Sequence, residues 1–160
     1  MLHNILSTVP ERVAMVERSQ WGDGLSREDM DQFAQYLYAA KADPGEIIFN
    51  EGAREPYMCL VAQGLIRITK GDSKKTVKTI CDIPPGRFVG EMSIIDGLPR
   101  SASATAVEET LVLVLTKDNF EQLLNDNPRL GVVLLKKLSQ MISHRLRVSD
   151  WMLAEYIYEQ

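Results

Sequence analysis

The chain has 160 residues, of which 45% are hydrophobic, and it carries a formal net charge of −4. This length suits one domain with a true hydrophobic core. The acidic balance argues against a nucleic-acid-binding domain, which is usually basic. Because no apolar run is long enough to cross a bilayer and no signal-peptide segment is visible, we expect a cytoplasmic protein without membrane contact. The two cysteines, Cys59 and Cys81, show no metal or redox spacing and are predicted to be buried thiols, with a disulfide as the alternative.

Residues 1–40 are predicted to be helical. Thr8 with Glu11 three residues later is a helix-start signal, and Ser26 with Asp29 resembles a second capping arrangement. Apolar side chains at helical spacing follow the second signal. They are Met30, Phe33, Ala34, Leu37 and Tyr38.

From residue 44 to residue 116 the pattern changes to short β-branched runs separated by glycine and proline. One of these runs, 65–70, alternates between apolar and polar residues as a half-buried strand does. Short strands at this spacing favour an antiparallel sandwich, a jelly roll or a small barrel. The predicted strands are Glu46–Asn50, Tyr57–Ala62, Leu65–Lys70, Thr76–Ile83, Ser101–Val107 and Thr110–Leu115.

The segment 88–102 interrupts these runs and is not predicted to be a strand. It places the carboxylate of Glu91 and the guanidinium of Arg100 nine residues apart in small, apolar surroundings. Glycines and a proline enclose about one helical turn, whose first N–H groups are unpaired and can bind an anion. A guanidinium suits a phosphate, and an ionised carboxylate accepts a hydrogen bond from a sugar hydroxyl. The segment therefore predicts either a pocket for a sugar phosphate or a structural ion pair that closes the loop.

Helical spacing returns after Thr116, which is a plausible N-cap. The pair Asn127-Pro128 ends this helix and starts a longer one, expected from Arg129 to at least Ser149. A heptad seam on the long helix is predicted to pack on the barrel, on a second subunit or on both. The seam residues are Leu135, Ser139, Ile142, Leu146, Ser149, Leu153 and Tyr156.

The long helix also carries five basic residues. We expect a solvated outer face there, with a partner or membrane surface as the alternative. These residues are Arg129, Lys136, Lys137, Arg145 and Arg147.

Together these features resemble the cyclic nucleotide-binding domain family of the bacterial catabolite activator, the regulatory subunits of cyclic-AMP-dependent kinase and gated ion channels. The likeness rests on Phe88-Val89-Gly90-Glu91, followed after a nine-residue step by Pro99-Arg100-Ser101-Ala102. Glycine turns at Glu51-Gly52 and Gln63-Gly64 match as well, and the likeness covers about residues 25–150.

The resemblance implies a mainly β fold with flanking helices: an eight-stranded jelly-roll barrel (double-stranded β-helix) with N-terminal helices and a long C-terminal helix. We expect a single domain with three parts. These are an N-terminal helical segment at 1–43, the barrel at 44–116, and C-terminal helices at 117–160 that serve as a lid or a dimerisation element.

The resemblance also implies roles for individual residues. Arg100, Ser101 and the N–H of Ala102 would bind the cyclic phosphate. Glu91 would hold the ribose 2′-hydroxyl, with Gly90 and Ser93 beside the sugar. The base-facing positions would be Ile68, Ile80, Cys81 and Ser149, for which ordinary barrel core is the alternative on the strands. The implied ligand is cyclic AMP, and cyclic GMP stays open because Ser101 could contact a guanine amino group.

The sequence gives little indication of an enzyme. His3 and His144 lie at opposite ends without an evident carboxylate or cysteine partner, and neither a P-loop nor a metal-ligand spacing is present. We therefore expect no catalytic residue, metal or cofactor, and no nucleic-acid binding by this chain. The predicted function is a sensor module that signals through its C-terminal helix to an unknown effector, as a possible homodimer. The alternatives are a protein-interaction module that does not use a nucleotide, or a regulator lacking its DNA-binding domain.

Overall fold

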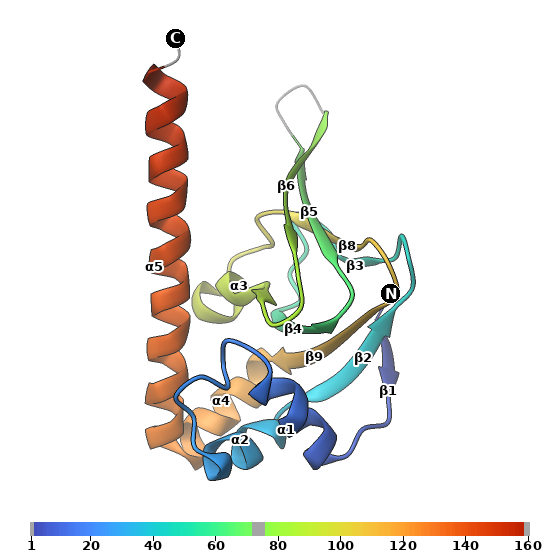
Figure 1. The fold of residues 1–160 in the computed structure, drawn as a ribbon, viewed down its shortest axis with the longest axis vertical. Coiled ribbons are helices and arrows are strands. Elements are labelled where there is room, and N and C mark those ends of the chain that lie inside the picture. The colour runs from blue at the N-terminus through green and yellow to red at the C-terminus, as the bar shows by residue number, and fades with distance from the viewer. Residues whose placement is uncertain (1, 72–75, 159–160) are drawn as a thin grey trace.

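The computed structural model describes residues 2–71 and 76–158. Its strands are β1 (His3–Ile5), β2 (Tyr38–Ala42), β3 (Ile47–Phe49), β4 (Tyr57–Gln63), β5 (Ile66–Gly71), β6 (Val77–Ile83), β7 (Phe88–Val89), β8 (Ser103–Ala106) and β9 (Thr110–Thr116). They form a five-stranded antiparallel sheet in the order β1-β2-β9-β4-β7 and a four-stranded one in the order β3-β8-β5-β6 (Figure 1). The predicted fold class, a mainly β barrel with helices at both ends of the chain, is confirmed.

The helices are α1 (Val9–Glu17), α2 (Arg27–Ala34), α3 (Glu91–Asp96), α4 (Lys117–Asp126) and α5 (Pro128–Tyr158). Both predicted capping signals operate, because Thr8 with Glu11 and Ser26 with Asp29 form capping boxes at α1 and α2. Thr116 caps α4 by accepting a hydrogen bond from the N–H of Asn119 at 3.2 Å. These helix starts were predictable because each cap satisfies N–H groups only three residues away.

The helical prediction for residues 1–40 is wrong at both ends. β1 pairs with β2, and β2 pairs in turn with β9 along Tyr38–Ala42. A short apolar run fits either a helix or a strand, and here the free edge of β9 decides the outcome by pairing. The N-terminal segment therefore contributes two strands to the larger sheet in addition to its helices.

The core has two parts that together hold the barrel and the first half of α5. Inside the barrel, side chains such as Phe49, Val61 and Ile66 form one cluster. The other cluster lies against the helices, where Trp21 stacks on Phe33 with ring centroids 4.9 Å apart and contacts Phe88 at 4.6 Å. One face of α5 joins this second cluster with three fully buried leucines, each worth roughly 2 kcal/mol of burial. They are Leu130, Leu134 and Leu138.

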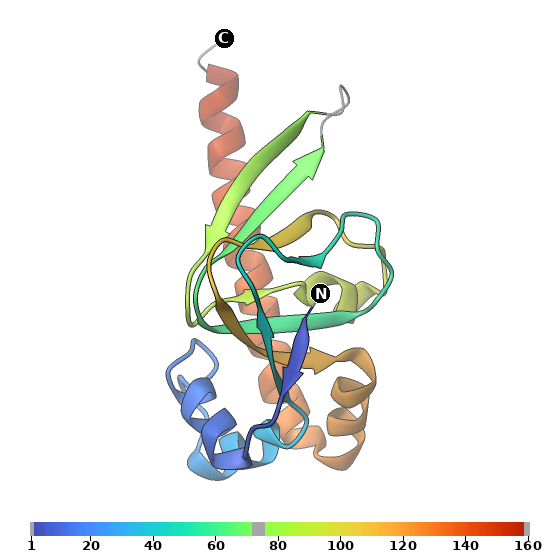
Figure 2. The same cartoon turned by 90° about the vertical axis from the view of Figure 1, so that its right-hand side faces the viewer.

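The predicted heptad seam of α5 is not the face that packs on the core. Leu135 contacts the core and Ile142 is half-buried, but Leu146 and Leu153 are 60% and 59% exposed. All residues from 143 to 155 are exposed, and the side chain of Tyr156 lies outside the described residues. The second half of α5 extends past the barrel in the same direction as the β5–β6 hairpin (Figures 1 and 2).

The two cysteines differ in environment. Cys59 is fully buried in β4, and burial raises its pKa to about 12. The prediction of a buried thiol is wrong for Cys81, which is exposed because β6 is an edge strand with little packed against it. No helix among the described residues is both long and apolar enough to span a membrane.

Asp29 joins α2 to the first turn of α5 and is expected to contribute to stability. Its carboxylate accepts from Ser26 N–H and from Arg129 while the residue is only 5% exposed. Burial alone raises the pKa of Asp29, but the hydrogen bonds from Ser26 and Arg129 outweigh it and hold the pKa below the ordinary 3.8. We expect Asp29→Asn to lower the free energy of unfolding at pH 7 by about 1 kcal/mol, as measured by urea titration.

A lowered pKa means that the stabilisation is complete above pH 3.8 and disappears as the pH falls through the folded-state value. The difference in the free energy of unfolding between wild type and Asp29→Asn should therefore become smaller in urea titrations below that pH. Asp31→Asn is the matched control, since that carboxylate is 49% exposed and its ion-pair partner Arg27 is 60% exposed. An equal loss of stability in the two variants would contradict the expectation.

Candidate functional site

The segment 88–102 forms a loop built around one short helix. β7 ends at Val89, and α3 begins at Glu91 after Gly90, whose φ is +85°. α3 ends at Asp96 and is capped by Gly97, where φ is +68° and the N–H donates back to the Ser93 carbonyl at 3.1 Å. The sequence-based prediction of a single helical turn enclosed by glycines is thus confirmed. Figure 1 shows α3 on the side of the barrel that faces α5.

Arg100 is buried, although arginine is rarely found inside proteins without partners. Its Nη1 donates to the Gly90 carbonyl at 3.0 Å and to the Ser93 hydroxyl at 2.7 Å. Its Nη2 donates to the Glu55 carbonyl at 2.8 Å. These acceptors hold the side chain in one orientation without placing a formal negative charge on it.

Two aromatic rings enclose the guanidinium of Arg100. Its Cζ lies 4.1 Å from the ring centroid of Phe49 and 4.5 Å from that of Tyr57. Such contacts favour a cation in a site from which water is excluded. Burial nevertheless lowers the pKa of Arg100 below its ordinary value. Within residues 2–71 and 76–158, this positive charge therefore has no ion-pair partner.

One edge of the Arg100 guanidinium remains available. A guanidinium has five N–H donors, and the hydrogen bonds to Gly90, Ser93 and Glu55 use three of them. Nε is buried without a partner among the described residues, and Nη2 has one further N–H. Because Nε and Nη2 lie along the same edge of the guanidinium plane, this edge suits a bidentate contact to two oxygens of an anion.

Gly90 is needed for the approach of Arg100. A Cβ atom at this position would lie 2.6 Å from Arg100 Nη1 and 3.0 Å from the Tyr57 carbonyl oxygen, which is closer than such atoms pack. Ser93 has a related role, because its hydroxyl accepts from Arg100 and donates to the Gly90 carbonyl at 3.1 Å. The residues predicted to flank the sugar thus also position the cation.

Glu91 is 2% exposed and pairs with a residue that sequence reasoning did not assign to the site. Its Oε1 accepts from Nη1 of Arg145 on α5, while its Oε2 is buried without a partner among the described residues. Arg145 also donates from Nη2 to the Phe88 carbonyl at 2.7 Å. The loop-closing ion pair between Glu91 and Arg100, which the sequence left open, is not among the ion pairs of the described residues.

Arg145 was expected on a solvated helix face, and its side chain is indeed 45% exposed. The sequence did not distinguish Arg145 from the other basic residues of α5, and it lies 54 positions after Glu91. The pair nevertheless connects the middle of the long helix to the first residue of α3. A displacement of α5 must therefore change the surroundings of Glu91.

The remaining predicted site residues differ in exposure and in the contacts they make. Ser101 is exposed, and its carbonyl accepts from Lys70 Nζ at 2.7 Å, while Ala102 is half-buried. Ile68 packs against the barrel core and is paired in register with Cys81 of β6. The other predicted base-facing residues, Ile80 and Ser149, are exposed. Arg100 therefore lies against two of the three predicted ribose residues, Gly90 and Ser93. The third, Glu91, pairs with Arg145 instead, and three of the predicted base-facing residues are exposed: Ile80, Cys81 and Ser149.

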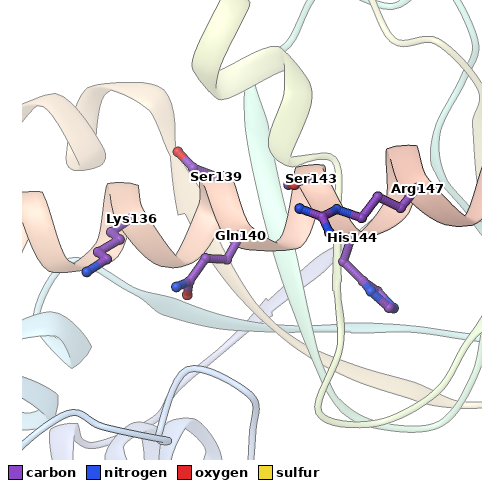
Figure 3. Close-up of a pocket in the computed structure, with 6 residues that line it drawn as sticks. All are labelled: Lys136, Ser139, Gln140, Ser143, His144 and Arg147. Atoms are coloured by element: carbon purple, nitrogen blue, oxygen red, sulfur yellow. The ribbon is translucent and has the colours of Figure 1, made fainter.

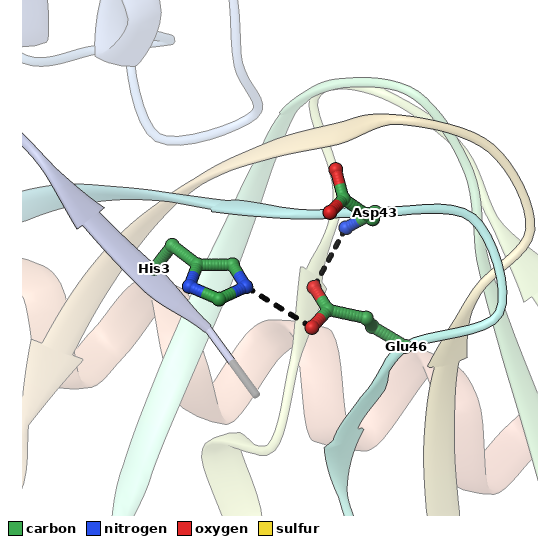
Figure 4. A group of neighbouring side chains, drawn as sticks. All are labelled: His3, Asp43 and Glu46. Atoms are coloured by element: carbon green, nitrogen blue, oxygen red, sulfur yellow. Dashed lines mark hydrogen bonds and ion pairs between the residues drawn. The ribbon is translucent and has the colours of Figure 1, made fainter.

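His3 does have a carboxylate partner, contrary to the sequence-based expectation. Its Nε2 lies 3.1 Å from Glu46 Oε1, and the Asp43 N–H donates to Glu46 Oε2 at 2.7 Å (Figure 4). These contacts, above all the Asp43 N–H, lower the pKa of Glu46 to about 2. Ligand atoms of these three residues lie within 4.8 Å of one another. Both Glu46 oxygens are already engaged, so the group pins β1 to the turn before β3.

A hollow of about 430 Å³ lies along α5 (Figure 3). Its lining comes entirely from one helix, so it is an open strip of surface without an opposite wall. The side chains that line it are Lys136, Ser139, Gln140, Ser143, His144 and Arg147.

Comparisons with known proteins agree on one family. A family model described as the cyclic nucleotide-binding domain matches residues 40–127, more than half of the chain. A crystal structure of a cyclic nucleotide-binding domain from Methylobacillus flagellatus has a TM-score of 0.81 and 32% identity, covering 92% of this chain and 83% of that one.

Two curated proteins extend the comparison. The cyclic AMP receptor protein of Thermus thermophilus is 32% identical over 127 residues, which are 79% of this chain and 57% of that protein. The cAMP-dependent protein kinase regulatory subunit of Yarrowia lipolytica is 30% identical over 100 residues, which are 62% of this chain and 26% of that protein. The chain thus spans little more than half of the first relative and about a quarter of the second.

Proposed function

The chain belongs to the cyclic nucleotide-binding domain family, and from this premise we propose that it is a sensor module that binds cyclic AMP and signals through α5. The observation that carries the proposal is that one loop supplies both a buried guanidinium with unpaired N–H groups and a buried carboxylate with one unpaired oxygen. The first belongs to Arg100 and the second to Glu91. A binding role rather than catalysis is supported by the receptor and regulatory subunit among the relatives.

The cyclic phosphate is proposed to bind at the free edge of Arg100. Its single negative charge matches the guanidinium, and its two exocyclic oxygens match the spacing of Nε and Nη2. The N–H groups of Ser101 and Ala102 would complete the phosphate site, as the family resemblance implies. The site is suited to this charge because Phe49 and Tyr57 exclude water from the faces of the guanidinium.

The ribose is proposed to bind at Glu91 Oε2. An ionised carboxylate only accepts hydrogen bonds, so this oxygen suits the 2′-hydroxyl as a donor. Arg145 holds the other oxygen and thereby orients the carboxylate. Gly90 and Ser93 would lie beside the sugar, in addition to positioning Arg100.

The purine is proposed to lie between the β5–β6 hairpin and α5. The residues that would face it are Ile68, Ile80, Cys81 and Ser149. Because Ile80, Cys81 and Ser149 are exposed in this structure, base binding would bury apolar surface that water now covers. Cyclic AMP is favoured over cyclic GMP because the Thermus relative is a cyclic AMP receptor protein, and Ser101 is the residue through which guanine could also be accepted.

Signalling is proposed to pass through the Glu91–Arg145 contact. A nucleotide that engages Glu91 changes the environment of Arg145, which sits on the half of α5 that is not held by the core. The ligand can shift α5 only by binding one of its positions better than the other. The three buried leucines at the start of α5 would serve as the fixed end of this movement.

The second half of α5 is the proposed partner surface. Between residues 143 and 155, four large apolar side chains are each about 60% exposed: Leu146, Trp151, Met152 and Leu153. A second copy of the chain is the partner we propose first, because the heptad seam extends into this region. The same exposed side chains favour the second candidate function, an interaction module that does not use a nucleotide.

Titration calorimetry with cyclic AMP, cyclic GMP and linear 5′-AMP tests the proposed function. We expect cyclic AMP to bind with Kd well below 1 mM, a binding free energy beyond about 4 kcal/mol. Cyclic GMP should bind more weakly, and 5′-AMP should not compete. The absence of binding for both cyclic nucleotides near millimolar concentration would refute the sensor function. A stable dimer whose association is the same with and without nucleotide would favour the interaction module instead.

A further inference from the structure

A pocket of about 280 Å³ lies between the turn after α1, the residue before β7 and the middle of α5. We call it the Trp21 pocket. It is separate from the residues proposed to bind phosphate and ribose, but it shares one wall with them, because Arg145 lines it and also pairs with Glu91. The residues that matter here are Trp21, Arg87, Lys137, Gln140, His144 and Arg145.

The walls of the Trp21 pocket are positively charged in a chain whose net charge is −4. Arg87, Lys137 and Arg145 outnumber the one acidic lining residue, Asp23. Lys137 Nζ is already engaged by the carbonyls of Gln20 and Asp23. Within residues 2–71 and 76–158, the Arg87 guanidinium has no hydrogen-bond or ion-pair partner. It is therefore free to bind a ligand, and Arg145 is already in place beside it.

Trp21 supplies an independent indication of a ligand. The residue is fully buried, yet its indole Nε1 has no hydrogen-bond partner among the described residues. A buried indole N–H usually finds an acceptor. Phe33 and Phe88 pack against the ring at centroid distances of 4.9 Å and 4.6 Å, so the indole cannot easily turn to seek one elsewhere. Because Trp21 is one of the residues that line the pocket, its unpaired N–H is a candidate donor to an acceptor bound there.

We propose that the Trp21 pocket is a second ligand site, for a small anion that carries two or more phosphate or carboxylate groups. Its uncommitted groups are mainly donors: an indole N–H, a free guanidinium and the amide of Gln140. Such a set recognises an acceptor-rich anion, because each oxygen can take a charge-assisted hydrogen bond. The volume of about 280 Å³ has room for an anion of the size of pyrophosphate or citrate.

The shared Arg145 couples this site to Glu91. An anion in the Trp21 pocket attracts the Arg145 guanidinium and competes with Glu91 for it. Cyclic nucleotide affinity should then fall, since Glu91 loses the group that orients it, and the nucleotide should weaken the anion by the same factor. This coupling rests on the proposed function, whereas the existence of the anion site does not.

The indole N–H resonance of Trp21 reports on the site directly. The chain has two tryptophans, and Trp151 is 63% exposed, so Trp151→Phe leaves Trp21 as the single indole signal in a ¹⁵N spectrum. Titration with pyrophosphate, and separately with citrate, should move this signal saturably to lower field. The anion that binds more tightly, pyrophosphate or citrate, shows whether phosphate or carboxylate groups are preferred. Sodium chloride at equal ionic strength should not reproduce the shift.

Two variants in the Trp151→Phe background distinguish anion binding in the pocket from a nonspecific effect of surface charge. Arg87→Gln should weaken the anion about tenfold, as expected for loss of one charge-assisted contact. Arg147→Gln removes the same charge from α5 outside the pocket and should leave the affinity unchanged. No saturable shift, or equal effects of the two variants, would overturn the site. Saturating pyrophosphate should also raise the Kd for cyclic AMP about fivefold or more, and an unchanged Kd in a protein that binds both would overturn the coupling.

Discussion

Arg100→Gln should weaken cyclic AMP binding at least about hundredfold, because it removes a bidentate, charge-assisted contact worth about 3 kcal/mol or more. Among the described residues, the Nε edge of this guanidinium is left without a partner, and glutamine cannot reproduce it. Calorimetry on the purified variant gives the change in Kd. Arg100→Lys should fall between wild type and glutamine, since an ammonium keeps the charge but loses the planar fork.

The matched control for this prediction is Arg67→Gln on β5. That guanidinium forms a two-point ion pair with Asp82 but is 43% exposed, so its removal should change affinity by less than about threefold. The same variants should also differ in stability, because Arg100→Gln removes the donor to the Glu55 carbonyl and one of the two donors to the Gly90 carbonyl. A folded Arg100→Gln protein that binds cyclic AMP within tenfold of wild type would show that the phosphate binds elsewhere.

Glu91→Gln should remove the discrimination between cyclic AMP and its 2′-deoxy analogue. In the wild type, the analogue leaves Glu91 Oε2 buried and unpaired, so its affinity should be about tenfold to hundredfold lower than that of cyclic AMP. An amide in place of the carboxylate is a poorer acceptor, so the two ligands should bind within a few-fold of each other. Parallel titrations of both ligands give the ratio without dependence on the absolute affinity.

Arg145→Gln separates the carboxylate from its partner. This variant keeps Glu91, so the preference for the 2′-hydroxyl should persist while the absolute affinity changes. The double variant should then show that the two effects are not additive, because the residues are in direct contact. If Glu91→Gln kept the full preference for cyclic AMP over the deoxy analogue, the ribose could not lie at Glu91.

Much of the candidate site was predictable because its parts are close in sequence. Glu91 and Arg100 are nine residues apart, and the glycines that end the single turn lie between or beside them. The helix caps at Thr8, Ser26 and Thr116 are local in the same sense. In each case one or two turns of backbone fix the geometry, so residue type and spacing carry the information.

The contacts that complete the site are not local. Arg145 meets Glu91 across 54 residues, and nothing in the charge pattern of α5 distinguishes it from Lys136 or Arg147. The aromatic enclosure of Arg100 likewise brings together Phe49 and Tyr57 from different strands. A sequence pattern gives the face on which a side chain lies, but it does not give the element that will cover that face.

The amino-acid sequence by itself determined the helix starts, the strand-rich middle, the short helix at Glu91 and the charge types offered to a ligand, because periodicity and capping act within a few residues. Only the tertiary structure decided that β1 and β2 join the sheet and that the face at Leu130 rather than the seam packs on the core. It also decided that Arg145 rather than Arg100 takes the Glu91 carboxylate. These outcomes depend on which surfaces remain unpaired once the rest of the chain has folded, a property that no single segment contains.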